Sequence, residues 1–266
     1  MRLPIYVADA FCDRPFSGNP AAVVPLDYWL ETETMQAIAE QHNLSETAFV
    51  VMHPDEHRNR PLRWFTPARE VRLCGHATLA TAFVLGDVLQ VPGDEFGFTT
   101  LSGPLHCNKT EDGWKLDLPA DVAELSPDFV AQAEAVVGSS PMAVLEGKDD
   151  LLIILDSAEA VHSLVPDGNA IRATGKRGVV VSARGDEGYD VVSRCFYPEF
   201  GIDEDAVTGS AHTLIGPYWS SRLGKAQLRC RQASRRGGDV AVHYAGGERI
   251  SLGGGTRLYM HGEIKV

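Results

Sequence analysis

The stretch RWFTP at residues 63–67 is the best indicator of the fold, because a similar segment, RCFYP, occurs again at residues 194–198. The two copies share Arg, Phe and Pro at matching positions. A glycine-containing segment follows each copy, CGHA at residues 74–77 and TGSA at residues 208–211. The second pair of segments is three residues further apart in the chain than the first, which implies a short insertion. A repeated strand, loop and helix of this kind predicts an internal duplication.

Each of these segments leads into an apolar helix, predicted over residues 75–89 and 210–223, with Gly224 ending the second. Helices that are apolar nearly all round are buried, so each half is expected to contain a central helix. An amphipathic helix is predicted over residues 30–42. Alternating and apolar runs predict strands at residues 5–11, 21–26, 44–51, 63–66, 151–155, 178–182, 189–196, 249–252 and 258–261. The sequence therefore predicts an α/β (α+β) protein.

Composition and charge narrow the class of protein. The chain has 266 residues, 44% hydrophobic and 23% charged, and a net charge of −12, which argues against nucleic-acid binding. Apolar runs are too short for a membrane span. The acidic Asp9 comes too early for a signal peptide, and the five cysteines form no metal-ligand pattern, which predicts reduced thiols in the cytoplasm and no metal site. No dinucleotide or phosphate-binding loop is present in the sequence.

The two glycine-led helices can bind a carboxylate. A helix N-terminus offers unpaired backbone N–H groups and partial positive charge, and Gly75 and Gly209 let a ligand approach the backbone closely. Two such ends would hold a carboxylate and stabilise enolate-like charge formed beside it. The alternative is that both glycines serve only tight strand-to-helix turns.

Glu46 is the candidate acid–base residue. It shares a strand face with Leu44, Ala48 and Val50, so its carboxyl group is partly desolvated, a setting that suits a group taking and returning a proton. The alternative is a strand-end Glu that points to water or pairs with an arginine.

Three further polar residues lie beside the predicted helix ends. His76 could relay a proton or bind substrate, or be a buried structural histidine. Asp205 could support catalysis or cap the second helix. Ser210 could bind substrate or be an ordinary residue of the first turn.

Cys74 has two interpretations. A thiol at a helix N-terminus is a plausible base or nucleophile. A two-base racemase would need a second thiol at the matching position, which is Thr208, so Cys74 is more simply a small turn residue.

Six ordered motifs resemble the PhzF-like family over nearly the whole chain. They are residues 9–11 (DAF) with 15–23 (PFSGNPAAV), 43–49 (NLSETAF), 63–67 (RWFTP), 74–78 (CGHAT), 203–212 (DEDAVTGSAH) and 232–238 (QASRRGG). The resemblance implies a diaminopimelate-epimerase-like fold of two pseudo-symmetric halves, each a curved, mostly antiparallel sheet or open barrel around a central helix. The first half would comprise residues 1–112 with about 250–266, and the second residues 113–249, with the active site in the cleft between them.

The resemblance also implies a homodimer without a cofactor, and it assigns roles by motif position. Glu46 would be the acid–base residue, supported by His76, Asp205 and Ser210. The expected substrate contacts are Gly75, Gly209, Asn19 and Thr208. The cysteine of CGHAT departs from the phenazine-pathway enzyme itself, which indicates a role outside phenazine synthesis.

The expected function is a cofactor-independent isomerase that shifts a proton on a small carboxylate, with Glu46 working on one face of the substrate. Two alternatives stay open at this point. One is an amino-acid racemase or epimerase assisted by Cys74. The other is a non-catalytic small-molecule binding protein on the same fold.

Overall fold

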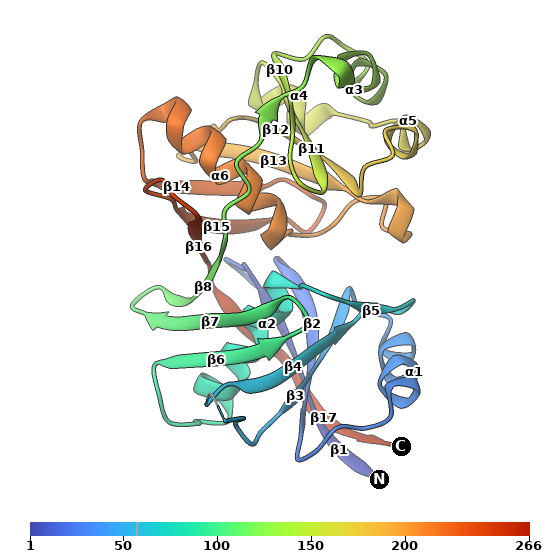
Figure 1. Cartoon of the computed structure of the whole chain (residues 1–266), viewed down its shortest axis with the longest axis vertical. Helices are drawn as coiled ribbons and strands as arrows, with labels where there is room; N and C mark the ends of the chain where they lie inside the picture. The colour runs from blue at the N-terminus through green and yellow to red at the C-terminus, as the bar shows by residue number, and fades with distance from the viewer. Residues whose placement is uncertain (57) are drawn as a thin grey trace. The chain divides into compact units, whose positions relative to one another are not determined.

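The computed structural model describes residues 1–56 and 58–266, and the chain divides into two compact units. The first unit is Met1–Asp117 with Gly253–Val266, and the second is Leu118–Leu252. Both mix helices and strands, so the predicted fold class is confirmed (Figure 1). Within the described residues, no helix is both long enough and apolar enough to cross a membrane.

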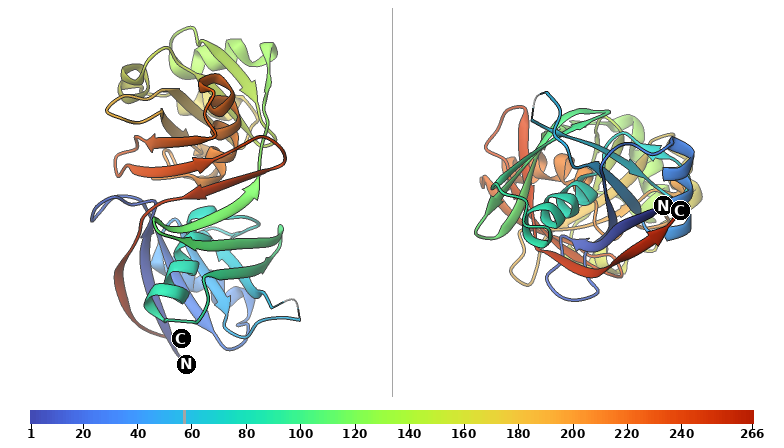
Figure 2. Two further views of the ribbon diagram at one scale, coloured as in Figure 1. Left: turned by 90° about the vertical axis from the view of Figure 1, so that its left-hand side faces the viewer. Right: turned by 90° about the horizontal axis from the view of Figure 1, so that it is seen from below.

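The first unit is a sheet with two helices. Its strands are β1 (Arg2–Ala10), β2 (Asn19–Leu26), β3 (Glu46–Val51), β4 (Arg60–Phe65), β5 (Glu70–Val71), β6 (Glu95–Thr100), β7 (Gly103–Thr110), β8 (Gly113–Pro119) and β17 (Thr256–Lys265). Its helices are α1 (Thr32–His42) and α2 (Gly75–Phe83), which continues into the π-helical turn η1 (Val84–Val88). Strands β1 and β17 pair antiparallel, which brings the two termini together (Figure 2).

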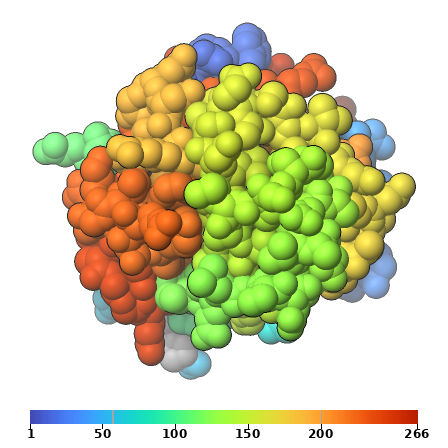
Figure 3. Space-filling model, turned by 90° about the horizontal axis from the view of Figure 1, so that it is seen from above, coloured from blue at the N-terminus to red at the C-terminus, as the bar shows by residue number. Residues whose placement is uncertain are grey.

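The second unit repeats this mixture with more helices. Its strands are β9 (Glu124–Leu125), β10 (Ala143–Glu146), β11 (Asp150–Ile154), β12 (Gly178–Arg184), β13 (Val191–Phe196), β14 (Gln227–Gln232), β15 (Gly238–His243) and β16 (Arg249–Gly253). Its helical segments are η2 (Pro127–Phe129), α3 (Val130–Val137), α4 (Ala158–Ser163), α5 (Gly168–Ala173), η3 (Pro198–Phe200) and α6 (Gly209–Leu223). The segment around α3, in green, lies on the face of this unit seen in Figure 3.

The two units share one order of strand pairing. In the first, β1–β2 is antiparallel, β2–β3 parallel, β3–β4 antiparallel, β4–β6 parallel and β6–β7 antiparallel. In the second, the same alternation runs through β10–β11, β11–β12, β12–β13, β13–β14 and β14–β15. The predicted pseudo-symmetry is therefore present in the backbone itself.

Each unit wraps its sheet around one buried helix. Helix α2 packs against β1, β2, β3 and β7, and its residues from Gly75 to Ala82 are all buried. Helix α6 packs against β11, β14 and β15. Small residues such as Ala77 and Ala80 allow this close approach, since a helix buried all round must fit between strands.

A second layer covers the outer face of each sheet. In the first unit, Leu3, Ile5 and Val7 of β1 pack in one cluster with Met35 and Ile38 of α1. In the second unit, α3, α4 and α5 supply the corresponding cover over β11, β12 and β13. Strand β3 is therefore buried on both faces, which places its first residue at the edge of a dry interior.

The repeated Arg and Phe have a structural role. Arg63 donates to Glu70 through Nε and Nη2, both at 2.7 Å, and Arg194 donates to Glu204 through Nε at 2.6 Å and Nη2 at 3.1 Å. Each guanidinium lies 5.1 Å from the ring centre of the phenylalanine two residues on. Glu70 is seven residues beyond Arg63, and Glu204 is ten beyond Arg194. The three extra residues of the second half therefore lie between the strand and its tethering acid.

Candidate active site

Glu46 meets the head of the central helix of the first unit. Its position is fixed by the parallel register of β3 on β2, in which Glu46 lies opposite Ala21. Oε2 of Glu46 is 3.1 Å from Nε2 of His76, and the two side chains are 14% and 6% exposed. The two atoms form an ion pair with each other, and neither has a hydrogen bond to any further described residue. The expected partial desolvation of this carboxyl group is confirmed.

His76 is held on its other side by Cys74. Cys74 is the N-cap residue of α2 in an extended conformation, and its Sγ lies 3.5 Å from Nδ1 of His76. Gly75 comes between them at the first helical position, where a backbone N–H has no acceptor within the helix. The arrangement is a buried chain of thiol, imidazole and carboxylate beside a free helix end.

The charges in this chain follow from its contacts. Burial alone would lower the pKa of His76, but Cys74 and Glu46, which face its two ring nitrogens, raise it well above its ordinary value. Burial, and then the charge of Glu46, raise the pKa of the Cys74 thiol to about 11. With the thiol protonated near neutral pH, Cys74 is a poor base, and the charge that then favours the protonated form of His76 is that of Glu46.

The same three residues carry donor atoms within 4.8 Å of one another, the spacing of a metal site. Their placement does not suit a shared ion, because Glu46 faces Nε2 of the ring and Cys74 faces Nδ1. An imidazole binds an ion in its plane through one nitrogen, so an ion at either nitrogen would lie away from one of the other two ligands. The row of thiol, imidazole and carboxylate groups is therefore better suited to proton transfer than to metal binding.

Asn19 is linked to the neighbourhood of Glu46 by a hydrogen bond to the preceding residue, Ser45. It is buried at the start of β2, and its Oδ1 accepts a hydrogen bond of 3.0 Å from the hydroxyl of Ser45, the residue before Glu46. The structure thus brings Glu46, His76, Gly75 and Asn19 of the predicted set into one region of the first unit.

Thr208 organises the predicted residues of the second unit. It is the N-cap of α6, although its side chain makes no capping bond. Its hydroxyl donates instead to Oδ2 of Asp205 at 2.6 Å, and its backbone N–H donates to Oε1 of Gln232 at 2.8 Å. Nε2 of Gln232 donates to the carbonyl of Asp205 at 3.0 Å. Asp205 therefore helps to fix the turn before the helix.

Gln232 and His212 were not assigned roles from the sequence, although both lie in quoted motifs. Gln232 is fully buried and binds three groups of the turn before α6. His212 is also fully buried, and its Nδ1 lies 2.8 Å from the carbonyl of Thr208. Burial lowers the pKa of His212 to about 4, so it is neutral and donates from Nδ1. In α2, Thr78 makes the matching bond to the carbonyl of Cys74.

Ser210 lies on the first turn of α6 against an ion pair between Arg177 and the buried Asp150. Nη2 of Arg177 is 3.2 Å from Oγ of Ser210, and Nε of Arg177 donates to Oδ1 of Asp150 at 2.8 Å. A second bond joins Nη2 to Oδ2 of Asp150. Neither residue of this pair was predicted. Their signal in the sequence is slight, since Arg177 follows Lys176 and Asp150 follows Asp149, and such charged pairs ahead of two strands look like ordinary surface residues.

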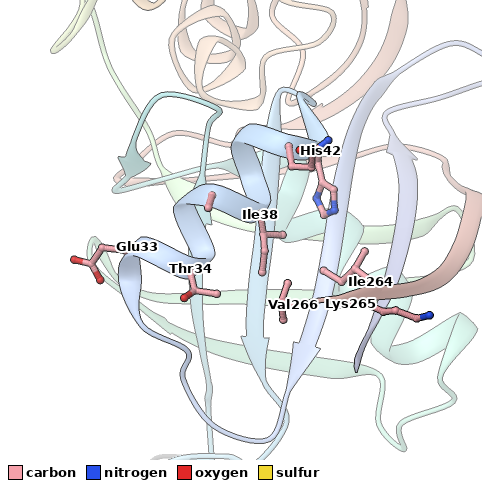
Figure 4. Close-up of a pocket in the computed structure, with 9 residues that line it drawn as sticks. Glu33, Thr34, Ile38, His42, Ile264, Lys265 and Val266 are labelled. Atoms are coloured by element: carbon pink, nitrogen blue, oxygen red, sulfur yellow. The ribbon is translucent and has the colours of Figure 1, made fainter. Parts of the chain in front are cut away.

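A separate groove lies on the first unit between α1 and the end of β17 (Figure 4). It is lined by Glu33, Thr34, Ala37, Ile38, Gln41, His42, Ile264, Lys265 and Val266. None of the predicted site residues lines it. The apolar side of the groove belongs to the outer layer, on the face of the sheet away from α2.

Comparison with known proteins gives one consistent family. A family model described as phenazine biosynthesis-like protein matches residues 8–262. A curated relative from Pseudomonas aeruginosa, named as an uncharacterised isomerase, is 47% identical over 266 residues and is covered completely, as is this chain. A mouse phenazine biosynthesis-like domain-containing protein is 39% identical, with 99% of each chain covered.

A solved structure supports the same conclusion. The crystal structure of a PhzF-family protein from Enterococcus faecalis matches with a TM-score of 0.93 and 42% identity over 100% of both chains. The predicted resemblance is confirmed by these matches.

Proposed function

Because this chain belongs to the phenazine biosynthesis-like protein family, we propose that it is an isomerase that shifts a proton on a small carboxylate without a cofactor. The observation that carries the proposal is the contact of 3.1 Å between Glu46 and His76 at the head of a buried helix. A carboxylate and an imidazolium in one dry site form an acid–base pair, and the helix end beside them is suited to negative charge.

The reaction begins with Glu46 as the base. The carboxylate of Glu46 takes a proton from a substrate carbon that lies next to the conjugated system of the substrate's own carboxylate group. The electron pair of the broken C–H bond moves into that π-system. The N–H groups at Gly75 stabilise the enolate-like charge. The protonated Glu46 then gives a proton to another carbon on the same face, which moves a double bond and regenerates the carboxylate.

His76 and Cys74 support this step without exchanging a proton with carbon. The imidazole of His76 contacts the carboxyl group of Glu46 through Nε2, and the thiol of Cys74 holds the ring in place at Nδ1. The proposal extends to the second unit, where Gly209, Ser210, Thr208 and Asp205 are assigned to binding the substrate's carboxylate. Family membership also supports a cytoplasmic homodimer, which light scattering on the purified protein would test.

The direct test is deuterium uptake from D2O into a panel of small cyclic and acyclic amino, hydroxy and unsaturated carboxylates, followed by NMR. Wild type is compared with Glu46→Gln, which keeps the shape and removes the base, and with Glu40→Gln on the exposed face of α1 as a control. General acid–base catalysis contributes about 10²–10⁴-fold, so Glu46→Gln should lower the exchange rate by about that factor. Unchanged exchange in Glu46→Gln would refute the mechanism.

A further inference from the structure

The two halves differ at the position of the base. Thr47 of β3 pairs with Phe65, and Val179 of β12 pairs with Phe196, the matching phenylalanine of the repeat. The residues before them, Glu46 and Gly178, therefore correspond. By the same register, Ser45 corresponds to Arg177.

No side chain can replace Gly178. A Cβ atom there would lie 2.2 Å from the ring of Tyr197 and 2.7 Å from the carbonyl oxygen of Phe196. The second half therefore has no room for a base at this position, and the functional group next to it is the guanidinium of Arg177.

Arg177 is fixed on three sides. Asp150, only 3% exposed, receives two of its N–H groups, and the ring of Tyr197 lies 5.5 Å from the centre of the guanidinium. The backbone N–H of Arg177 donates to the carbonyl of Asp149 at 3.0 Å. About a third of the Arg177 side chain, 34%, stays exposed. A bidentate, stacked arginine is a rigid donor, since little side-chain freedom is left.

The rigid donor determines what Ser210 can do. A serine hydroxyl has one proton and two lone pairs, and an arginine can only donate. Oγ of Ser210 accepts from Nη2 of Arg177 at 3.2 Å, so the hydroxyl proton of Ser210 must point away from the guanidinium. Ser210 is half-buried on the first turn of a 15-residue helix, where backbone N–H groups are also unpaired. A donor set of this kind suits a carboxylate.

We propose that Arg177 is a positioning residue that makes Ser210 a hydrogen-bond donor to the carboxylate of the substrate. The inference rests on the proposed function, because it takes the substrate to be a carboxylate. The inference goes beyond the proposed function because it assigns a role to the Asp150–Arg177 pair, which lies outside the six sequence motifs.

The test is calorimetric binding of the panel carboxylates and of their primary amides. Arg177→Lys keeps a cation beside Asp150 but cannot hold Asp150 and Ser210 together as the planar fork does. It should weaken carboxylate binding about tenfold or more and leave the amides unchanged. Ser210→Ala should do the same, and the double variant should be no weaker than Ser210→Ala alone. Arg172→Lys, an exposed arginine of α5, is the control.

Several outcomes would overturn the inference. One is carboxylate binding by Arg177→Lys as tight as that of wild type, and another is a double variant whose loss is the product of the two single losses. If Arg177→Lys does not fold, Ser210→Ala still decides, since it leaves the ion pair intact and must lose the preference for carboxylate over amide. In turnover assays the positioning role predicts a raised KM with kcat little changed, whereas a merely structural role would lower the melting temperature.

Failure of this inference and failure of the proposed function are distinguishable. Glu46→Gln tests proton exchange and should bind the panel carboxylates normally. Suppose that Glu46→Gln loses exchange but binds normally, and that Arg177→Lys also binds normally. The proposed isomerase function would then stand, and only the role of Arg177 would be refuted.

Discussion

Glu46 and Gly178 occupy the same place in the two halves of the duplicated fold, each one residue ahead of a strand residue that pairs with the repeated phenylalanine. One half carries a carboxylate there, and the other has its space filled by the ring of Tyr197. The two halves therefore share the backbone at this position, and Glu46 is the member of the pair that carries a carboxyl group. One carboxyl group at this position fits the proposed proton transfer on one face of a substrate.

Gly178→Ala should be strongly destabilising. The added methyl group would overlap both the Tyr197 ring and a backbone carbonyl, and the carbonyl cannot move aside. Overpacking of this kind costs about 1–3 kcal/mol, and the upper end is expected here. Urea unfolding monitored by circular dichroism measures it. Gly168→Ala, at the start of α5 with its nearest neighbour 3.7 Å away, should be neutral or stabilising. Equal stabilities of the two variants would contradict the close packing at Gly178.

Cys74→Ala should reduce proton exchange far less than Glu46→Gln does. The Cys74 thiol has a pKa of about 11 and is almost fully buried, so it supplies little thiolate near neutral pH. Iodoacetamide should accordingly label it slowly at pH 7. Cys107→Ala, at a fully buried cysteine of β7, serves as the matched control. A loss in Cys74→Ala as large as that in Glu46→Gln would favour the cysteine-assisted racemase.

His76 should make the protein less stable as the pH rises. Its pKa is raised in the folded state, so its stabilising contribution is complete below about 6.5, the pKa of an unfolded histidine, and is lost as the pH rises through the folded value. In His76→Gln the unfolding free energy should therefore fall less than in wild type as the pH rises above about 6.5. The exposed His53→Gln provides the comparison. Parallel pH profiles for wild type and His76→Gln would show that the imidazole is not charged.

His212 should act in the opposite direction. Its folded pKa of about 4 lies below the unfolded value of about 6.5, so the unfolded chain binds the proton first and stability falls as the pH drops from 6.5 to 4. The full effect is about 3 kcal/mol, from roughly 2.5 pKa units. His212→Gln should therefore lose less stability on acidification than wild type, and the exposed His243→Gln should behave as wild type. If His212→Gln lost stability on acidification as wild type does, the pKa of His212 would not be lowered in the folded state.

The sequence alone predicted the two central helices, the strands of the repeat and the candidate acid–base residue, but it missed strands β6, β7, β8, β10, β14 and β15 and helices α3, α4 and α5. Residues 75–83 and 209–223 are apolar nearly all round, so burial of each helix follows from composition, and the repeated RWFTP and RCFYP segments predict matching strands. Glu46 stood out because it is the acidic residue on a strand face otherwise made of apolar or small side chains. These patterns involve residues close together in the chain, so they can be recognised without the tertiary structure.

Tertiary structure decided which polar groups meet. The Arg177–Asp150 pair joins residues 27 apart in the chain, and Gln232 reaches Thr208 across 24 residues. Such contacts depend on strand register and helix packing, which shift side chains by whole residues without changing composition. The thiol of Cys74 also shows this: a helix N-terminus favours a low pKa, but burial beside Glu46 raises it to about 11. Desolvation and neighbouring charge are properties of the folded surroundings, and no residue carries them in its sequence position.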